Sequence, residues 1–154
     1  MRKKNKGGNR MRLILPAVSV NEGIARAAVA AFCAQCNPGA TELADIKCAV
    51  SEAVTNCIVH AYRERMGEIY ITVHLIARGV RISVRDRGCG IEDVALAREP
   101  LFTTDAAGER SGMGFTVMES FMDAVEVRSA VGSGTTVRLV KVISARAETF
   151  ARRA

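Results

Sequence analysis

Three short motifs along the chain combine carboxylate, amide and glycine residues in a fixed order: Glu52-x-x-x-Asn56, then Asp86-x-Gly88-x-Gly90, then Gly112-x-Gly114. A carboxylate can accept a proton from a nucleophile, and an amide oxygen can bind Mg²⁺. Glycines let a backbone approach a flat base or a phosphate closely. Each motif alone is common, but their order and spacing predict a pocket for a nucleoside triphosphate and its magnesium ion.

The first motif lies in an apolar stretch with helical spacing. Its apolar stripe, which we expect to face a sheet, consists of Leu43, Ile46, Val50, Val54, Cys57 and Ala61. Glu52 and Asn56 are one helical turn apart, away from this stripe and beside Cys48 and Val59. A carboxylate and an amide flanked by apolar groups indicate one wall of a partly closed cavity. The alternative is an exposed glutamate and asparagine on an amphipathic helix.

Asp86 follows a segment, Val80 to Val84, in which every second residue is apolar. This alternation predicts a strand that directs the Asp86 side chain to the buried face. A buried carboxylate needs a hydrogen-bond donor, and the exocyclic amine of adenine is one. Gly88 and Gly90 would let the backbone turn beneath the base. The alternative is that Asp86 caps a short helix near Ile91.

Gly112-Met113-Gly114 stands where a helix is predicted to begin. The first turn of a helix presents N–H groups and a partial positive charge, so this motif predicts a phosphate site, although its spacing is not that of a Walker loop. The loop ahead of it, with Thr103-Thr104-Asp105 and Gly108-Glu109-Arg110, could fold over the nucleotide as a lid. Arg110 could face the γ-phosphate or be a solvated loop charge.

Helices and strands that would position these motifs can be placed from periodicity and turn residues. Met11 to Leu15 is a short strand, and Ser19-x-x-Glu22 resembles a capping box that opens a helix ending at Asn37-Pro38-Gly39. Thr41 is the expected N-cap of the next helix, which runs to Ala61.

The second half of the chain is richer in strands. The expected elements are strands 68–76 and 80–85 around a tight turn, a short helix over 91–97, a helix from Gly112 to Met122, and a hairpin of strands 124–130 and 135–142. This order predicts an α+β two-layer sandwich whose mixed, mostly antiparallel sheet carries helices on one face.

Composition limits what the chain can be. Its 154 residues suit one domain, and no apolar run is long enough to cross a bilayer or form a signal peptide. We therefore expect a cytoplasmic protein with a basic flexible leader (1–10), an ATP-binding domain (11–143) and a C-terminal tail (144–154). The tail is either a short helix or frayed.

The whole net charge of +6 comes from the first twelve residues, which hold six basic and no acidic side chains. The remainder has sixteen of each sign, so we expect a solvated leader and no direct contact with nucleic acid or membrane. Five cysteines favour a reduced protein without a disulfide framework. Cys33-x-x-Cys36 lacks the further ligands of a zinc site, and we expect small buried side chains instead.

The three motifs, together with Gly134-Thr135, resemble the four boxes of the gyrase, Hsp90, histidine-kinase and MutL ATPase superfamily. Three longer stretches closely resemble the anti-sigma-F factor serine kinases of spore-forming bacteria: 50–56 (VSEAVTN), 100–104 (PLFTT) and 109–116 (ERSGMGFT). The resemblance extends from Met11 to about Val142, and it implies a Bergerat-type ATP-binding fold.

The resemblance also implies roles for residues at matching positions. Glu52 would be the general base toward a partner serine, Asn56 a Mg²⁺ ligand, and Asp86 the adenine anchor assisted by Thr135. Arg26 would contact the sigma and anti-anti-sigma proteins, unless it is a solvated helix charge. The implied ATP site further includes Gly88, Gly90, Thr103, Thr104, Ser111, Gly112, Met113 and Gly114, with Arg110 beside the phosphates.

The function implied is that of a protein-serine kinase that holds a sporulation sigma factor inactive while ATP is bound. It would phosphorylate a serine of the anti-anti-sigma factor, and a homodimer follows from the resemblance alone. One alternative is a stress-response relative acting on another sigma factor. A second is a nucleotide-dependent binding module with negligible kinase activity. A sensor histidine kinase is disfavoured, because neither His60 nor His74 lies on a separate dimerisation helix.

Overall fold

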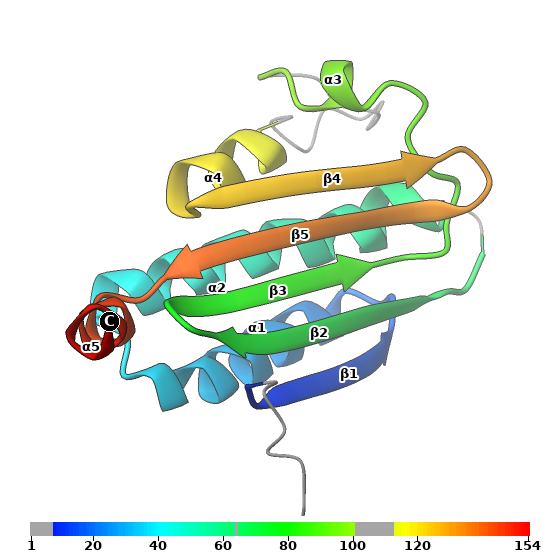
Figure 1. The fold of residues 1–154 in the computed structure, drawn as a ribbon. Coiled ribbons are helices and arrows are strands. Elements are labelled where there is room, and N and C mark those ends of the chain that lie inside the picture. Colours follow the sequence, from blue (N-terminus) through cyan, green and yellow to red (C-terminus); the bar gives the residue numbers. More distant parts are fainter. Residues whose placement is uncertain (1–7, 64, 101–112) are drawn as a thin grey trace, which may run out of the picture.

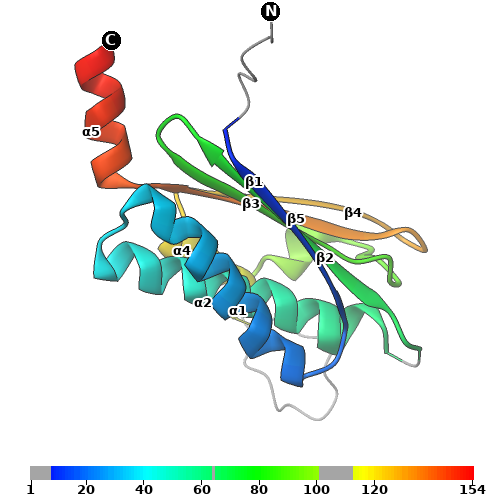
Figure 2. The same cartoon turned by 90° about the horizontal axis from the view of Figure 1, so that it is seen from below.

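A single sheet with helices packed on one face forms the body of the protein (Figures 1 and 2). The computed structural model describes residues 8–63, 65–100 and 113–154. The elements in chain order are β1 (Arg10–Pro16), α1 (Val20–Cys33), the 3₁₀ turn η1 (Ala34–Cys36), α2 (Ala40–Asn56), the π-helical segment η2 (Cys57–Ala61), β2 (Glu68–Ile76), β3 (Gly79–Arg85), α3 (Val94–Ala97), α4 (Gly114–Phe121), β4 (Ala124–Ala130), β5 (Gly134–Val142) and α5 (Ser144–Arg153).

Within the described residues the sheet has five strands in the order β1-β2-β3-β5-β4. Each of these described pairings is antiparallel, so the expectation of a mixed sheet was wrong. The α+β sandwich itself is confirmed. In the register, Val84 lies opposite Ile71 on one side and Val137 on the other, which aligns the apolar positions of three strands on one face.

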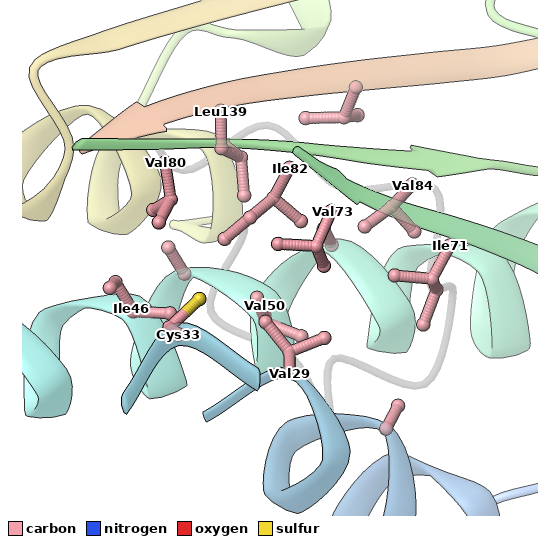
Figure 3. Packing of buried hydrophobic residues seen from close by; sticks show 14 of the residues in the cluster. Val29, Cys33, Ile46, Val50, Ile71, Val73, Val80, Ile82, Val84 and Leu139 are labelled. Carbon is pink, nitrogen blue, oxygen red and sulfur yellow. The ribbon is translucent and has the colours of Figure 1, made fainter. Parts of the chain in front are cut away.

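The core lies between this apolar face and helices α1 and α2 (Figure 3). Alternate residues of β2 and β3, among them Ile71, Val73, Ile82 and Val84, are almost fully buried. From α2, the predicted stripe is buried from Ile46 to Ala61, whereas Leu43 is only partly covered. The strands bury every second residue and α2 buries one stripe against them. This packing determines which side of α2 faces away from the sheet and can carry a functional site.

No described helix crosses the opposite face of the sheet (Figure 2). The register places arginines there on four of the strands: Arg10, Arg12, Arg81, Arg85, Arg128 and Arg138. Burial of the imidazole, and then the charges of Arg81, Arg10 and Arg12, lower the pKa of His74 because they disfavour its protonation. On this face Glu126 forms ion pairs with Arg128 at 2.6 Å and with Arg138 at 3.4 Å, so part of the positive charge is paired.

Helix ends differ from the sequence expectations in three places. Ser19 has helical dihedral angles and makes no capping bond, so the expected capping box was wrong. Gly39, and not Thr41, caps α2, and the Glu42 carboxylate accepts a hydrogen bond from its N–H at 2.8 Å. The α-helix ends at Asn56 and continues as a π-helix. Of the two alternatives for the C-terminal tail, the helix is the one found, as α5.

Candidate functional site

A cavity of about 1190 Å³ opens between α2, the ends of β3 and β5, the segment after Asp86 and the start of α4. It is large enough for a nucleotide. Seven of the predicted site residues line it: Glu52, Asn56, Asp86, Gly90, Met113, Gly114 and Thr135. Three motifs that are far apart in sequence thus meet around one cavity, as predicted.

Glu52 and Asn56 meet the start of α4 at one end of the cavity. A Cβ placed on Gly114, the first residue of α4, would lie 3.2 Å from Glu52 Oε2 and 3.4 Å from Asn56 Oδ1. The absence of a side chain at Gly114 therefore allows the helix start to approach both polar groups. Directly after Asn56 the helix becomes π-helical, a local change that is frequent at functional sites.

Asp86 also lines the cavity, and its side chain is buried as the alternation of β3 predicts; the residue is 5% exposed. Its Oδ1 accepts hydrogen bonds from the N–H groups of Gly88 at 2.9 Å and Thr135 at 3.2 Å. Burial raises the pKa of Asp86, and these two bonds partly oppose that rise. The helix cap considered as an alternative is supplied by Asp93, whose Oδ1 accepts from Leu96 N–H.

Comparison with known proteins places this cavity in a family. The family model for the histidine kinase-like ATPase domain matches residues 15–141. A protein of Caldanaerobacter subterraneus subsp. tengcongensis, named anti-sigma F factor, is 54% identical over 135 residues, covering 88% of this chain and 94% of the relative. The anti-sigma F factor of Bacillus subtilis is 52% identical over 137 residues, with coverage of 88% and 94%.

This chain belongs to the anti-sigma F factor family. The same fold occurs in the RsbU and RsbW domains of a Mycobacterium tuberculosis protein, with a TM-score of 0.65 and 23% identity, covering 88% of this chain and 32% of that one. A blue-light activated histidine kinase domain from Erythrobacter litoralis has a TM-score of 0.55 and 21% identity, with coverage of 84% and 64%. At such identities the likeness concerns the fold.

In this anti-sigma F family chain, several predicted site residues lie away from the cavity or outside the described part. Arg26 is on the exposed side of α1, where it forms an ion pair with Glu22 at 3.0 Å and a hydrogen bond to Ser51 Oγ at 3.3 Å. Gly88 does not line the cavity. The residues Thr103, Thr104, Arg110, Ser111 and Gly112 lie outside the described residues, and α4, the helix predicted to begin at Gly112, begins at Gly114.

The reason given for a cavity wall at Glu52 was only partly right. Cys48 is exposed, and neither it nor Val59 lines the cavity. The wall instead depends on α4 and on the segment after Asp86, which lie across from the polar side of α2. The local sequence around Glu52 therefore predicted the correct side of α2, but the neighbours it named are not the ones that form the wall.

Two side chains that support the site were not predicted. The hydroxyl of Ser129 on β4 accepts a hydrogen bond from Ile91 N–H at 2.7 Å and lies 2.8 Å from Thr135 Oγ1. The thiol of Cys57 lies 3.7 Å from Asp86 Oδ2. Cys57 was assigned only to the apolar stripe, and no local signal distinguishes a stripe position that also contacts a carboxylate 29 residues away.

The zinc alternative finds no support in the described part of the chain. Cys33 and Cys36 are buried and reduced, and burial raises the pKa of the Cys33 thiol to about 12. The described residues contain no group of three or more His, Cys, Asp or Glu side chains that could hold a metal. Among these residues there is also no helix long and apolar enough to cross a membrane.

Close backbone contacts explain why positions 88 and 90 are occupied by glycine in this chain. A Cβ on Gly88 would lie 2.2 Å from the carbonyl oxygen of Ala61, and one on Gly90 would lie 2.2 Å from that of Ala130. Gly90 also has a φ of 76°, which side-chain-bearing residues rarely adopt. The two glycines thus let the segment after Asp86 pack on protein backbone, whereas the prediction placed them beneath a base.

Replacing Gly90 by alanine should destabilise the protein strongly. Gly132 offers a matched control, because its φ is 79° and no atom lies within 4 Å of an added Cβ. We expect Gly132→Ala to lose about 1–2 kcal/mol from the left-handed conformation alone. Gly90→Ala should lose about 2–3 kcal/mol, since the contact adds to the same strain. Denaturant unfolding measures both, and equal losses would show that the backbone contact has no cost.

Proposed function

We propose that this chain is a protein-serine kinase that uses ATP and Mg²⁺, inhibits a sporulation sigma factor and phosphorylates the anti-anti-sigma factor. The observation that carries the proposal is that Glu52 and Asn56 lie beside the start of α4 on a cavity that the buried Asp86 also lines. The proposed base, metal ligand and phosphate site would thus be neighbours, with a base-recognition group on the same cavity.

The residues present fit a bound adenine nucleotide. Asp86 Oδ1 accepts from two backbone N–H groups, while Oδ2 faces only the weak thiol donor of Cys57 among the hydrogen bonds found for it. Oδ2 can therefore accept a hydrogen bond from the amine of adenine. Beside Glu52 and Asn56, the first turn of α4 would bind phosphate oxygens through its N–H groups. Thr135 would assist adenine binding at Asp86, because its N–H donates a hydrogen bond to the Asp86 carboxylate.

Asn56 would contribute its amide oxygen to Mg²⁺. The described residues provide no cluster of carboxylates beside it, which suits an ion that keeps several water molecules and shares the phosphate oxygens. Bound ATP with Mg²⁺ supplies the phosphoryl group and neutralises its charge. We assign to Arg110 and the other residues in 101–112 only what the family resemblance implies for them, which is contact with the phosphates.

Glu52 would orient the hydroxyl of the partner serine and accept its proton. Its carboxylate reaches the same helix start as Asn56, so the hydroxyl and the phosphate site would be neighbours. Proton acceptance by a positioned carboxylate typically contributes 10²–10⁴-fold to a rate, as an order of magnitude. Without this step the protein would still bind nucleotide, which separates a kinase from a binding module.

The exposed side of α1 is the proposed partner surface. Arg26 is exposed on this helix, where its guanidinium pairs with Glu22 at 3.0 Å and donates to Ser51 Oγ at 3.3 Å. Arginine is among the residues enriched at protein interfaces. The names of the relatives indicate a sigma factor as one partner. A homodimer is proposed from the family resemblance only.

The test is to capture partners on the immobilised full chain in the presence of ATP or ADP, and to add radiolabelled ATP to each captured protein. We expect sigma-F to be retained with ATP and the anti-anti-sigma factor to be labelled on serine. Retention of a different sigma factor would favour the stress-response alternative. Nucleotide-dependent retention without any labelling would favour a binding module and contradict the kinase.

A further inference from the structure

The two carboxylate oxygens of Asp86 have different surroundings. Oδ1 is held by the backbone N–H groups of Gly88 and Thr135, at 2.9 Å and 3.2 Å. Oδ2 is contacted by the Cys57 thiol at 3.7 Å. Because the backbone bonds fix one oxygen, the orientation of the other toward α2 and the cavity is fixed too. Both Asp86 and Cys57 line the cavity.

The Cys57 thiol has a second acceptor within reach. Its Sγ lies 3.4 Å from the carbonyl oxygen of Ala53, one turn earlier on α2. A thiol carries one hydrogen and is a weak donor, so it can serve only one of these acceptors at a time. Cys57 is also the first residue of the π-helical segment η2, where α2 meets the segment after Asp86.

We propose that Cys57 is a positioning residue for Asp86 that exchanges its hydrogen-bond acceptor when an adenine base binds. Without a base, the S–H group donates to Asp86 Oδ2 and partly compensates the buried carboxylate. When the exocyclic amine of adenine donates to Oδ2, the S–H group turns to the Ala53 carbonyl oxygen. The inference rests on the proposed adenine site at Asp86, and it adds a residue to which no role in that site has been assigned.

The weak donor strength of a thiol suits the position beside Asp86 Oδ2. A strong donor at this position would hold Oδ2 and compete with the amine of the base, whereas an apolar group would leave the buried oxygen without a partner. A thiol lies between these limits. The buried Cys57 thiol is not reactive, because burial and the neighbouring Asp86 carboxylate both raise its pKa. Its role here is that of a neutral donor.

The S–H stretching vibration reports this exchange directly. Its infrared band lies apart from other protein bands, and it shifts to lower frequency as the hydrogen bond to the thiol strengthens. The difference between wild type and Cys57→Ala assigns the Cys57 band among those of the other four cysteines. We expect saturating ADP to move this band to higher frequency, because a carbonyl oxygen is a weaker acceptor than a carboxylate. Should the alanine variant not fold, Cys57→Val serves the same assignment.

Two controls separate base recognition from general tightening of the site. Inosine diphosphate carries an oxygen in place of the amine, so it should leave the Cys57 band unmoved at concentrations that saturate the site. Asp86→Asn should move the band to higher frequency without any nucleotide, because it removes the charged acceptor. ADP should bind Cys57→Ala as tightly as wild type or up to about tenfold more tightly, since a competing donor has been removed.

The outcomes are distinct from those of the proposed function. If calorimetry shows saturating ADP binding and the Cys57 band stays in place, the exchange is wrong while the adenine site stands. A similar shift with inosine diphosphate, or weaker binding of ADP to Cys57→Ala, would also overturn it. If ADP does not bind at all, the proposed nucleotide site fails, and with it the premise of the inference.

Discussion

Glu52→Gln is expected to reduce phosphorylation of the partner serine by about 10²–10⁴-fold while leaving nucleotide binding close to wild type. Glutamine keeps the size of the side chain and can therefore take the same place beside Gly114 at the start of α4. An amide cannot accept the proton of a hydroxyl, so only the transfer step should suffer. The measurement is the initial rate of label transfer from radiolabelled ATP, together with the affinity for ADP by calorimetry.

Thr55→Val is the matched control for this variant. Thr55 lies on the same helix and lines the same cavity, and valine has nearly its shape. We expect close to wild-type transfer rates from this variant. If Glu52→Gln keeps its rate, another group is the base. If it loses nucleotide affinity in parallel with rate, Glu52 serves the geometry of the site and the assignment as base is wrong.

Local periodicity was sufficient to predict the sheet strands and the burial of Asp86. Alternation from Val80 to Val84 is a short-range property of the chain, and it carried over to Asp86 because the strand continues in the same pleat. The apolar stripe of α2 was likewise predictable, since the helix buries one side against the sheet. These predictions needed no knowledge of distant segments.

The π-helical segment could not be predicted in this way. Residues 57–61 continue an apolar pattern that suits an α-helix, yet the Ala61 carbonyl oxygen accepts a hydrogen bond from Cys89 N–H at 3.0 Å. The segment after Asp86 therefore packs directly on the end of this helix, and Gly88 is the residue that permits the contact. A contact between segments nearly thirty residues apart leaves no trace in helical periodicity. The same holds for the contact of Cys57 with Asp86.

Asp86→Asn is expected to lower the affinity for ADP by about 10–100-fold, since a hydrogen bond to a charged group typically contributes 1.5–3 kcal/mol. The asparagine oxygen can keep the bonds to Gly88 and Thr135 N–H, which leaves the amide NH₂ where Oδ2 accepted the amine of the base. Two donors then face each other. Asp93→Asn is the control, because Asp93 also lines the cavity but caps α3. It should bind ADP like wild type.

The pH dependence of ADP affinity and that of protein stability both follow from the raised pKa of Asp86. ADP affinity of the wild type should fall as the pH falls through that pKa, beginning at higher pH than for an ordinary aspartate. Asp86→Asn should lack this limb. Calorimetric titrations of both proteins over a series of pH values measure it, and an identical profile for both would contradict the role of the carboxylate.

The stability of the wild-type protein should fall as the pH rises, whereas its ADP affinity should fall as the pH falls. Because burial raises the folded-state pKa, the protonated Asp86 favours folding, and this contribution is complete below the unfolded-state pKa and lost as the pH rises through the folded-state value. The free energy of unfolding of Asp86→Asn relative to wild type should therefore increase over that interval. A difference that is constant with pH would show that ionisation of Asp86 has no cost to the fold. An increase would show that the fold tolerates a buried charge whose benefit is nucleotide binding.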